Sequence, residues 1–577
     1  MIRRPYALAA EDMFEKEIAA SIAAASAGAV TAAEAEAALE VPKDKKMGDL
    51  ALPCFKFART LKKAPPVIAK ELADALSLPD VVERAETAGG YLNFYFSSRA
   101  ICERLATLAD RKWDFTCGER EGEGKTICID YSSVNIAKPF HIGHLSTTVI
   151  GAALYRIFSY LGYRVVGINH LGDWGTQFGK LIVAVKKWSS LEEISSHDEY
   201  FLNSLYVRYH KEAENDPSLD DEARAWFKKI EDGDKEATEY FDAFKAITMR
   251  AVGKIYDRLK IRFDSYAGES FYNDKMQPCL DLLERKGLLT ESDGAKVVRL
   301  DEWDMPPCLL VKADGATLYA TRDIAAAYYR AATYDFHKCL YVVAYQQNLH
   351  FKQLFKVLEL MGFEKAKDME HVAFGMVSLE DGAMSTRGGR VVWLAEVLDK
   401  AVEKAKRIIE EKNPDQEDKD AVAESVGVGA VVFSALWNNR IKDIVFSFDK
   451  VLNFDGETAP YVQYTHARCA SALRKGGKYD LSAADFGAIA TEEGTEVAKC
   501  LLYFEDAVRA AARTREPCMV TRYAVELAEK FNRFYIGHRI VTEDAGAMNA
   551  RLFLADMVKN TLATALGLIG IDAPETM

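Results

Sequence analysis

The hydrophobic and polar positions of residues 125–168 change period twice, which predicts a strand, a helix and a second strand in succession. Ile127 and Ile129 fit a buried strand. Over residues 145–161 the apolar side chains recur at three- and four-residue spacing, as on the packed face of a helix. Residues 163–168 fit the second strand. Such a β-α-β unit is right-handed and leaves the loop after its first strand at the carboxyl edge of a parallel sheet, where helix amino-termini offer N–H groups to phosphates.

The same patterns divide the chain into five segments. Residues 1–105 read as a separate α/β module, with helical spacing near its start and strand alternation near its end. Sheet-forming segments at 106–188 and 301–400 flank a charged, helical insertion at 189–300. From 401 to 577 the pattern stays helical. We therefore expect an α/β multidomain protein with a parallel-sheet core, an insertion and an all-helical carboxyl-terminal part.

Within the second sheet-forming segment the pattern predicts four elements. A helix opens at about Asp323, and a strand at 340–344 leads to a helix near Leu349. A further strand is predicted at 371–377, before a glycine-rich loop.

Length and composition are those of a soluble, multidomain protein. A chain of 577 residues is too long for one core, and 49% hydrophobic with 28% charged residues is ordinary for globular proteins. We expect no secretory signal at the amino-terminus, and the longest apolar stretch, 426–437, is shorter than a membrane span and reads as a buried helix. The ten cysteines include no C-x-x-C pair, which predicts reduced thiols in a cytosolic protein.

The net charge of −13 by itself argues against a polyanionic partner, but binding requires only a local basic surface. One basic stretch has Phe55 and Phe57 interleaved among its cations: Lys43, Lys45, Lys46, Lys56, Arg59, Lys62 and Lys63. Such a run is more often a solvated face than a binding site.

Candidate chemistry begins at the predicted helix amino-terminus after the first strand. His141 and His144 share one helical face, and both can donate hydrogen bonds to phosphate oxygens, while Gly143 lets a flat base approach the backbone. Two histidines at this spacing can also lie in a core or on a surface without a ligand, or form half of a zinc site. Zinc is disfavoured because no nearby cysteine or carboxylate pair supplies the other ligands.

A second candidate is the glycine-rich loop at 381–392, DGAMSTRGGRVV. Its glycines permit an irregular path, and Ser385, Thr386, Arg387 and Arg390 supply donors suited to a triphosphate. An exposed hairpin turn is the competing interpretation.

Together these residues carry a resemblance to a known family. DYSSVNIAKPFHIGHL and NHLGDWGTQFGKL are similar to the signatures of arginyl-tRNA synthetases, which are class I aminoacyl-tRNA synthetases. The resemblance implies a Rossmann-type catalytic core in two halves around a connective insertion. It further implies an amino-terminal tRNA-binding module, in which the basic stretch meets phosphates, and a helical domain that contacts the tRNA stem and binds the anticodon.

The resemblance also implies roles for individual residues. The loop at 381–392 resembles a degenerate Lys-Met-Ser-Lys signature with Ala383 in place of the first lysine, and Lys138, with help from Arg387, is expected to supply the missing charge. The catalytic residues implied are His141, His144, Lys138, Ser385 and Arg387. The residues implied for ATP are His141, Gly143, His144, Met376 and Met384. Those implied for arginine are Asp130, Asn135, Tyr319, Asp323 and Gln347.

The chemistry of arginine agrees with two of these residues. A guanidinium is planar, always charged and carries five donors, so its pocket requires carboxylates. Asp130 ends the first predicted strand and Asp323 begins a predicted helix. Two acids converging on one cleft favour a cationic substrate, although Asp323 could instead cap its helix, and which acid dominates is open.

We therefore expect a cytoplasmic arginine–tRNA ligase that uses ATP and Mg²⁺, with tRNA(Arg), L-arginine and ATP as partners. We expect a monomer without membrane attachment and without a metal site of its own. The family needs bound tRNA before it activates arginine, and we expect the same here. The alternatives are another class I synthetase, such as that for cysteine or glutamate, and a catalytically impaired tRNA-binding protein descended from a synthetase.

Overall fold

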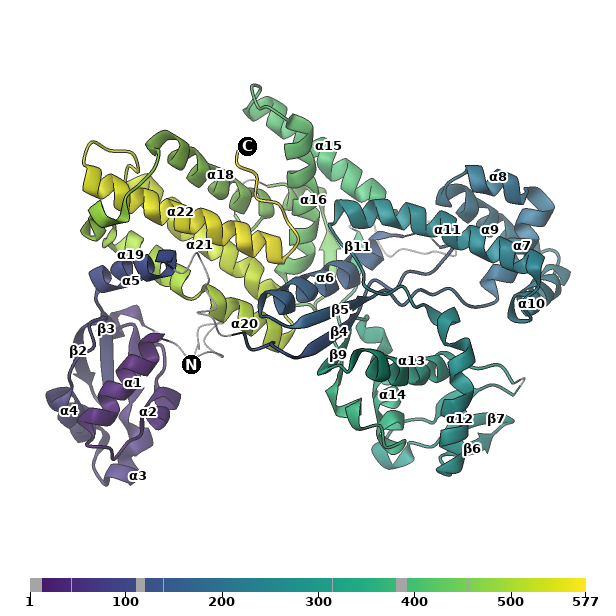
Figure 1. The fold of residues 1–577 in the computed structure, drawn as a ribbon, viewed down its shortest axis with the longest axis horizontal. Helices are drawn as coiled ribbons and strands as arrows, with labels where there is room; N and C mark the ends of the chain where they lie inside the picture. The colour runs from purple at the N-terminus through teal and green to yellow at the C-terminus, as the bar shows by residue number, and fades with distance from the viewer. Residues whose placement is uncertain are drawn as a thin grey trace. The chain divides into compact units, whose positions relative to one another are not determined.

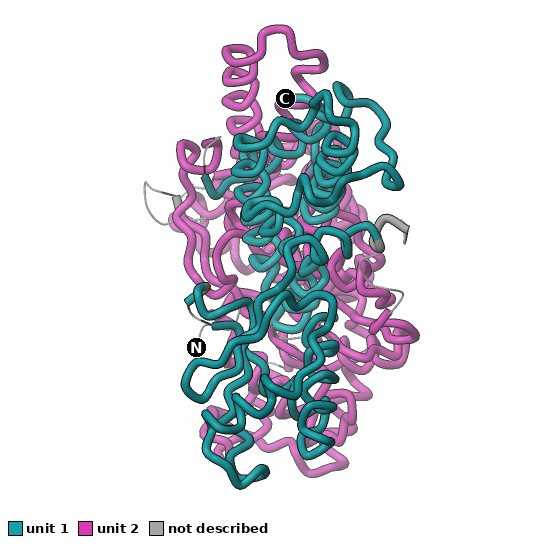
Figure 2. The backbone as a smooth tube through the Cα atoms, turned by 90° about the vertical axis from the view of Figure 1, so that its left-hand side faces the viewer, with its two compact units in different colours: residues 1–119, 454–567, 572–577 teal, residues 120–453, 568–571 magenta. Residues whose placement is uncertain are grey.

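The computed structural model describes residues 13–42, 44–110, 120–138, 140–313, 315–379, 392–453 and 456–577. The chain forms two compact units (Figure 2). Unit 1 comprises residues 1–119, 454–567 and 572–577, and unit 2 comprises residues 120–453 and 568–571.

Unit 2 is built on a four-stranded parallel sheet with strand order β10-β9-β4-β5 (Figure 1). The bounds are β4 Thr126–Asp130, β5 Arg164–Ile168, β9 Lys338–Tyr341 and β10 Met369–His371. The predicted β-α-β unit is confirmed: α6, Leu145–Tyr160, joins β4 to β5 and is buried from Leu145 to Leu154. Because the strands are parallel, the loops after β4, β5 and β9 meet at the carboxyl edge of the sheet.

Two neighbouring helices pack on this sheet, α13 (Tyr319–Tyr334) and α14 (Asn348–Leu360) (Figure 1). The predicted start of α13 at Asp323 is wrong by four residues. The Leu318 N–H and the Thr321 hydroxyl both donate to the Leu310 carbonyl of strand β8 (Cys308–Val311), at 3.0 and 2.7 Å. This anchor fixes the start of the helix, so Asp323 lies in the second turn rather than at the N-cap.

The predicted strand bounds in this region are also corrected. The strand expected at 340–344 is β9, which ends earlier, and the strand expected at 371–377 is two strands in different sheets. β10 belongs to the main sheet, whereas β11, Val377–Leu379, pairs with β12, Ile444–Phe446. Gly375 lies between them, and a Cβ there would be 2.4 Å from the backbone of Lys442. The chain leaves the main sheet near Gly375, where its backbone lies against that of Lys442.

The insertion is helical over most of its length, as predicted, and ends in a small antiparallel sheet. The side chains of Ser190, Asp198 and Asp234 cap three of its helices by accepting backbone N–H groups. Helix α7, Gln177–Trp188, precedes the insertion, and the helices of the insertion are α8 Leu191–Ser196, α9 Glu199–Ala213, α10 Ser218–Glu231, α11 Lys235–Arg258 and α12 Met276–Arg285. The strands are β6 Leu289–Ser292, β7 Ala295–Val298 and β8 Cys308–Val311.

Two long helices, α15 (Leu394–Lys412) and α16 (Lys419–Trp437), pack against each other in unit 2, and a short helix, α17 (Phe448–Val451), follows them. In the described ranges α16 alone is long and apolar enough to span a membrane, yet 67% of its most apolar window is buried inside the protein. It contains the buried helix predicted at 426–437 and also packs on α6.

Unit 1 combines an α/β module with a helical bundle, and α5 of the module packs on α19 of the bundle. The module contains an antiparallel sheet of order β1-β3-β2. Its elements are α1 Met13–Ala25, α2 Ala32–Ala38, β1 Leu50–Pro53, α3 Ala58–Leu61, α4 Pro65–Ala75, β2 Val82–Ala88, β3 Tyr91–Phe96 and α5 Ser98–Asp110. The bundle contains α18 Ala459–Gly476, α19 Glu492–Leu502, α20 Phe504–Thr514, α21 Cys518–Gly537 and α22 Ala545–Leu568.

Candidate active site

The loop between β4 and α6 is held in an unusual backbone conformation. Ser132, Ser133 and Ala137 have φ values of 68°, 49° and 60°, in the left-handed region that costs non-glycine residues energy. Two side chains of α11 hold this path: the Tyr256 hydroxyl lies 2.7 Å from Ser132 Oγ, and Thr248 accepts the Ala137 N–H at 3.0 Å. The loop is therefore positioned before any ligand arrives.

His141 and His144 lie at the end of this loop, directly before α6. His141 Nδ1 accepts the Gly143 N–H at 3.0 Å, and His144 Nδ1 accepts the His141 N–H at 3.2 Å. Burial lowers the pKa of both rings, that of His144 to about 3, so both are neutral at pH 7. Since Nδ1 of a neutral His141 accepts, its Nε2 carries the proton and can donate to a ligand. Nδ1 of His144 lies 3.2 Å from the His141 nitrogen and 3.3 Å from the His141 carbonyl oxygen, and the first of these contacts leaves the proton on Nε2.

Lys138 lies near enough to act electrostatically on two neighbours. Burial is the main cause that disfavours protonation of His144, and the charge of Lys138 adds to it. The same charge favours ionisation of Glu269, which burial opposes. The positive charge that the sequence assigned to Lys138 is therefore located beside the histidines.

Asp130, at the end of β4, forms an ion pair with Arg330. Its Oδ2 lies 2.6 Å from Nη2 of Arg330 on α13, and its Oδ1 accepts the Ser133 hydroxyl at 2.8 Å. The two paired side chains are 7% and 1% exposed. The structure thus neutralises one of the two acids that the sequence proposed for a cationic substrate.

Asp323, the second proposed acid, is half-buried and lies on α13. Its Oδ2 is 2.7 Å from Nε2 of His350 on α14. Burial opposes ionisation of this carboxyl, but the hydrogen bond and charge of His350 outweigh burial and lower its pKa. Among the described residues its Oδ1 accepts no hydrogen bond, so an ionised oxygen remains for a donor.

The remaining residues predicted for arginine surround the same sheet edge. Asn135 lies in the loop after β4, Tyr319 begins α13 and is 65% exposed, and Gln347 is exposed at the end of a 3₁₀ turn, Tyr345–Gln347, that follows β9. Asn135 packs on Gly172 so closely that a Cβ at Gly172 would lie 2.3 Å from its Oδ1. The structure brings all five residues to the carboxyl edge, although it pairs Asp130 internally.

Comparisons with known proteins identify the family to which the chain belongs. Residues 109–448 match the family "tRNA synthetases class I (R), catalytic domain", residues 462–577 the "DALR anticodon binding domain", and residues 12–96 the "Arginyl tRNA synthetase N terminal domain". The chain belongs to the arginyl-tRNA synthetases.

Individual relatives agree with this family. The arginine–tRNA ligase of Alkaliphilus metalliredigens is 51% identical over 93% of this chain and 95% of its own length. That of Clostridioides difficile is 50% identical over 94% and 96%. The solved structure of Thermus thermophilus arginyl-tRNA synthetase is similar with a TM-score of 0.79 at 28% identity, and covers 98% of this chain and 100% of that one.

The synthetase is therefore an arginine–tRNA ligase of class I, and the predicted fold class and function are confirmed. The alternative, a catalytically impaired tRNA-binding protein, is not favoured, because relatives that are 51% and 50% identical over most of the chain are arginine–tRNA ligases. The predicted domain boundaries stay predictions.

Sequence reasoning missed several residues that shape the synthetase site. Asp173, in the loop after β5, has a fully buried side chain that bonds Lys245 of α11 at 2.8 Å and Ser270 at 2.8 and 2.9 Å. It thereby fixes a 3₁₀ turn, Glu269–Lys275, whose first residue is an acid with a side chain that is 13% exposed. Burial raises the pKa of Glu269 to about 7 against the opposing charge of Arg322. Asp173 lies in the sequence GDWG, residues 172–175, which is part of the family signature, but that sequence does not reveal the hydrogen-bond partners of Asp173.

Two parts of the predicted site have limited structural description. Ser385, Arg387 and Met384 lie outside the described residues, whereas Met376 is described beside β11, where its N–H bonds Asp443 at 2.7 Å. Across the described ranges, no group of three or more His, Cys, Asp or Glu side chains is arranged to hold a metal ion.

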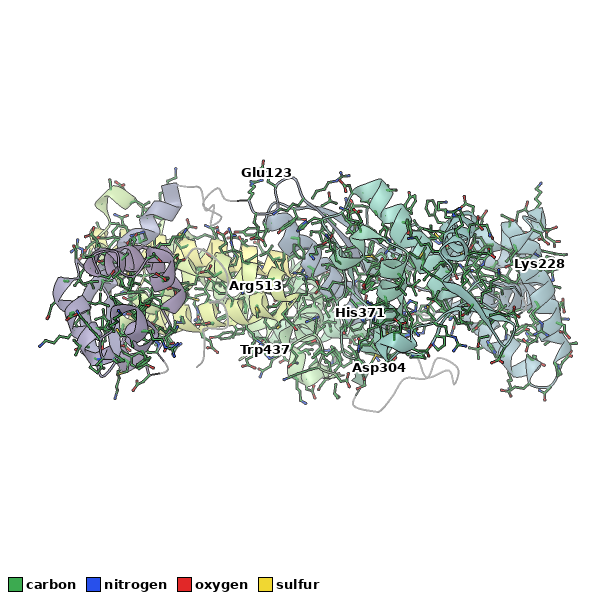
Figure 3. The ribbon with its side chains drawn as sticks, turned by 90° about the horizontal axis from the view of Figure 1, so that it is seen from below. Glu123, Lys228, Asp304, His371, Trp437 and Arg513 are labelled. Atoms are coloured by element: carbon green, nitrogen blue, oxygen red, sulfur yellow. The ribbon has the colours of Figure 1, made fainter. Side chains whose placement is uncertain are left out.

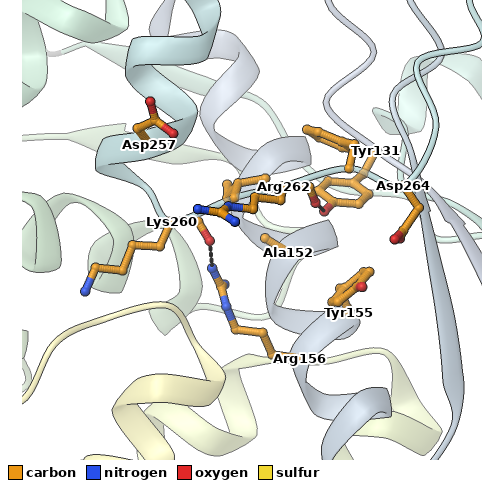
Figure 4. A pocket seen from close by; sticks show the side chains of 10 residues that line it. Tyr131, Ala152, Tyr155, Arg156, Asp257, Lys260, Arg262 and Asp264 are labelled. Atoms are coloured by element: carbon orange, nitrogen blue, oxygen red, sulfur yellow. Dashed lines mark hydrogen bonds between the residues drawn. The ribbon is translucent and has the colours of Figure 1, made fainter.

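A separate hollow of about 430 Å³ lies between α6 and the segment after α11 (Figure 4). Arg156 on its wall donates to the carbonyl of Lys260 at 2.7 Å and that of Leu259 at 3.4 Å, at the carboxyl end of α11. A cation stabilises carbonyls at a helix carboxyl-terminus. None of the predicted site residues lines this hollow, and Arg156 serves the fold of the synthetase.

Proposed function

We propose that this ligase makes arginyl-tRNA in two steps at the carboxyl edge of the β10-β9-β4-β5 sheet. In the first step the arginine carboxylate attacks the α-phosphate of ATP, forming arginyl-adenylate and releasing pyrophosphate. In the second, the terminal ribose hydroxyl of tRNA(Arg) takes the arginyl group and AMP leaves. The observation that supports the proposal is that Glu269 feels the charges of both Asp323 and Lys138, which connects the acid of α13 with the loop that carries the two histidines.

We assign the guanidinium of arginine to Asp323. Its Oδ1 is available to the planar fork of donors, and its negative charge persists at pH 7 because its pKa is lowered. Tyr319 is exposed and precedes Asp323 by one turn of α13, and we assign its hydroxyl a further contact with the substrate. Asn135 and Gln347 bind the α-amino end. Asp130 has a supporting role, because Arg330 already balances its charge.

We assign the α-phosphate to the histidines. The Nε2 protons of His141 and His144 donate to oxygens on which charge builds in the transition state, and the rings need no protonation change to do so. Lys138 supplies positive charge from the loop, with Ser385 and Arg387 of the degenerate signature. Gly143, Met376 and Met384 complete the ATP site, where Gly143 leaves room over the backbone.

Magnesium is expected to reach the site as an ion bound by ATP. Among the described residues, no group of three or more His, Cys, Asp or Glu side chains is arranged to hold a metal ion. We propose that Mg²⁺ arrives bound to the nucleotide phosphates.

We propose that the amino-terminal module contacts tRNA(Arg) and that the ligase works as a cytoplasmic monomer. Of the basic stretch, Lys56 bonds the Ala38 carbonyl at 3.1 Å and Lys63 pairs with Glu71, so part of its charge serves the fold. Phe57 is buried, but Phe55 is 46% exposed and can contact a base. Phosphate contacts here would make tRNA binding salt-dependent.

The substitution Asp323→Asn tests the assignment of arginine. It removes a charge that contacts the guanidinium, so the KM for arginine should rise by roughly 10²-fold, as expected for a lost charged hydrogen bond of about 3 kcal/mol. The KM for ATP should not change. Asp304→Asn, on an exposed aspartate labelled in Figure 3, is the matched control. An unchanged KM for arginine in Asp323→Asn would contradict the assignment.

A further inference from the structure

His350 is a histidine that the two-step reaction leaves without a role, yet it contacts the proposed arginine-binding acid. Its Nε2 lies 2.7 Å from Asp323 Oδ2, and the two side chains are 24% and 21% exposed. An ionised carboxylate can only accept hydrogen bonds, so Nε2 carries a proton. Burial lowers the pKa of His350, but the hydrogen bond and charge of Asp323 outweigh burial and raise it above its usual value.

In the empty site, therefore, His350 keeps its second ring proton to a higher pH than a free imidazole, and the imidazolium lies against Asp323. A guanidinium that binds Asp323 brings a second cation next to the first, and like charges at this range disfavour each other. Arginine stays protonated because its guanidinium cannot be deprotonated in proteins. The imidazolium is the cation that can lose its charge.

We propose that His350 is a proton-linked specificity residue, which loses its Nδ1 proton to solvent when the substrate guanidinium binds Asp323. The imidazolium becomes a neutral imidazole and one proton leaves. The Nε2–H group keeps its hydrogen bond to Asp323, so the carboxylate stays oriented toward the substrate. This inference rests on the proposed contact between Asp323 and arginine.

The groups around the pair define the competing sources of a proton. Arg330 acts on Asp323 from α13 and stays charged, because the nearby negative groups overcome burial and hold its pKa well above the usual value. His371 of β10 lies close enough to His350 to feel its charge, and burial lowers its pKa, which favours the neutral ring. Burial keeps Cys308 and Tyr341 neutral as well. The remaining groups are His170, after β5, and Glu269, whose pKa of about 7 makes it the main competitor.

Proton release has a consequence for affinity. A ligand whose binding releases a proton binds more tightly as the pH rises. The Kd for arginine should therefore fall as the pH rises through the pKa of His350, by up to about tenfold per pH unit at the steepest, and become constant above it. A neutral analogue such as citrulline would not displace the proton, so its Kd should not fall as the pH rises.

Calorimetry of arginine binding to the intact, tRNA-free protein tests the proposal. Titrations at a series of pH values in two buffers of different ionisation enthalpy give the number of protons released, which we expect to be largest at low pH and to decline toward zero as the pH rises above the raised pKa of His350. His350→Gln keeps an Nε2–H donor and cannot titrate, so the release should disappear and the Kd should become almost independent of pH. His371→Gln, at a histidine labelled in Figure 3 that bonds the Val343 carbonyl at 2.9 Å, is the matched control and should keep the release.

Two further variants separate the competitors. Glu269→Gln and His170→Asn should both retain the release if His350 is its source. Loss of the release in either of them, with retention in His350→Gln, would overturn the proposal. Binding of arginine without any proton release would overturn it as well and leave the proposed function intact. Absence of arginine binding by the unaltered protein would instead contradict the proposed function.

Ring-proton NMR of the unaltered protein covers the case in which His350→Gln fails to fold or to bind. The rings of His350 and His371 both contact Phe351, so His350 is identified as the histidine signal that has a cross-peak to the Phe351 ring and is retained in His371→Gln. Saturating arginine should lower the pKa of that signal, and an unchanged pKa would contradict the proposal.

Discussion

At the scale of single residues, the structure adds partners that the sequence could not supply. The histidine pair was predictable because its two members lie three residues apart at a helix start. The pairing of Asp130 with Arg330 was not predictable, because these residues are 200 positions apart and meet only when α13 packs on β4. His350 was hidden for the same reason, since its partner lies 27 residues away on another helix. The residue types of the site could thus be predicted, and their charge state could not.

The substitution His144→Ala tests the role given to the Nε2 donors. Loss of one preorganised donor should lower kcat by roughly 10²- to 10³-fold with tRNA affinity unchanged. His337→Ala, at an exposed histidine before the amino end of β9, is the matched control and should keep full activity. Steady-state aminoacylation and a tRNA-binding titration measure the two effects. A normal rate in His144→Ala would remove the histidine pair from the mechanism.

At the scale of elements, periodicity found the core and missed where elements end. The β-α-β unit was predictable because strand and helix periods follow each other without interruption. The start of α13 depends on bonds to Leu310 of β8, and the split near residues 371–377 depends on the backbone around Lys442. Both are contacts between segments distant in sequence, which a local pattern does not contain.

Close packing between elements predicts opposite effects for one substitution at two helix positions. Gly427 of α16 meets the backbone of α15, where an added Cβ would lie 2.6 Å from Val402, whereas a Cβ at Gly253 of α11 meets nothing within 4 Å. Gly427→Ala should destabilise the fold by about 1–3 kcal/mol because the helices must separate. Gly253→Ala should stabilise it by up to about 1 kcal/mol because alanine favours helix. Thermal unfolding measures both, and equal effects would contradict the packing of α15 on α16.

At the scale of the whole molecule, each unit has its own part of the proposed reaction. Unit 2 contains the residues that we propose for arginine and the histidine pair, and unit 1 contains the segment that matches the amino-terminal family and most of the segment that matches the anticodon-binding family. The fold class could be predicted from the signatures, and the net charge of −13 did not prevent it, because binding depends on local charge. The composition of the two units could not be predicted, because residues at the two ends of the chain pack together in unit 1.

The central claim is tested most directly by transfer of labelled arginine to total tRNA with ATP and magnesium. Lysine is run in parallel, together with ATP–pyrophosphate exchange in the absence of tRNA. We predict charging with arginine, none with lysine, and exchange that requires tRNA. Failure to charge tRNA with arginine, while tRNA is still bound, would contradict this account and point to a tRNA-binding protein without ligase activity.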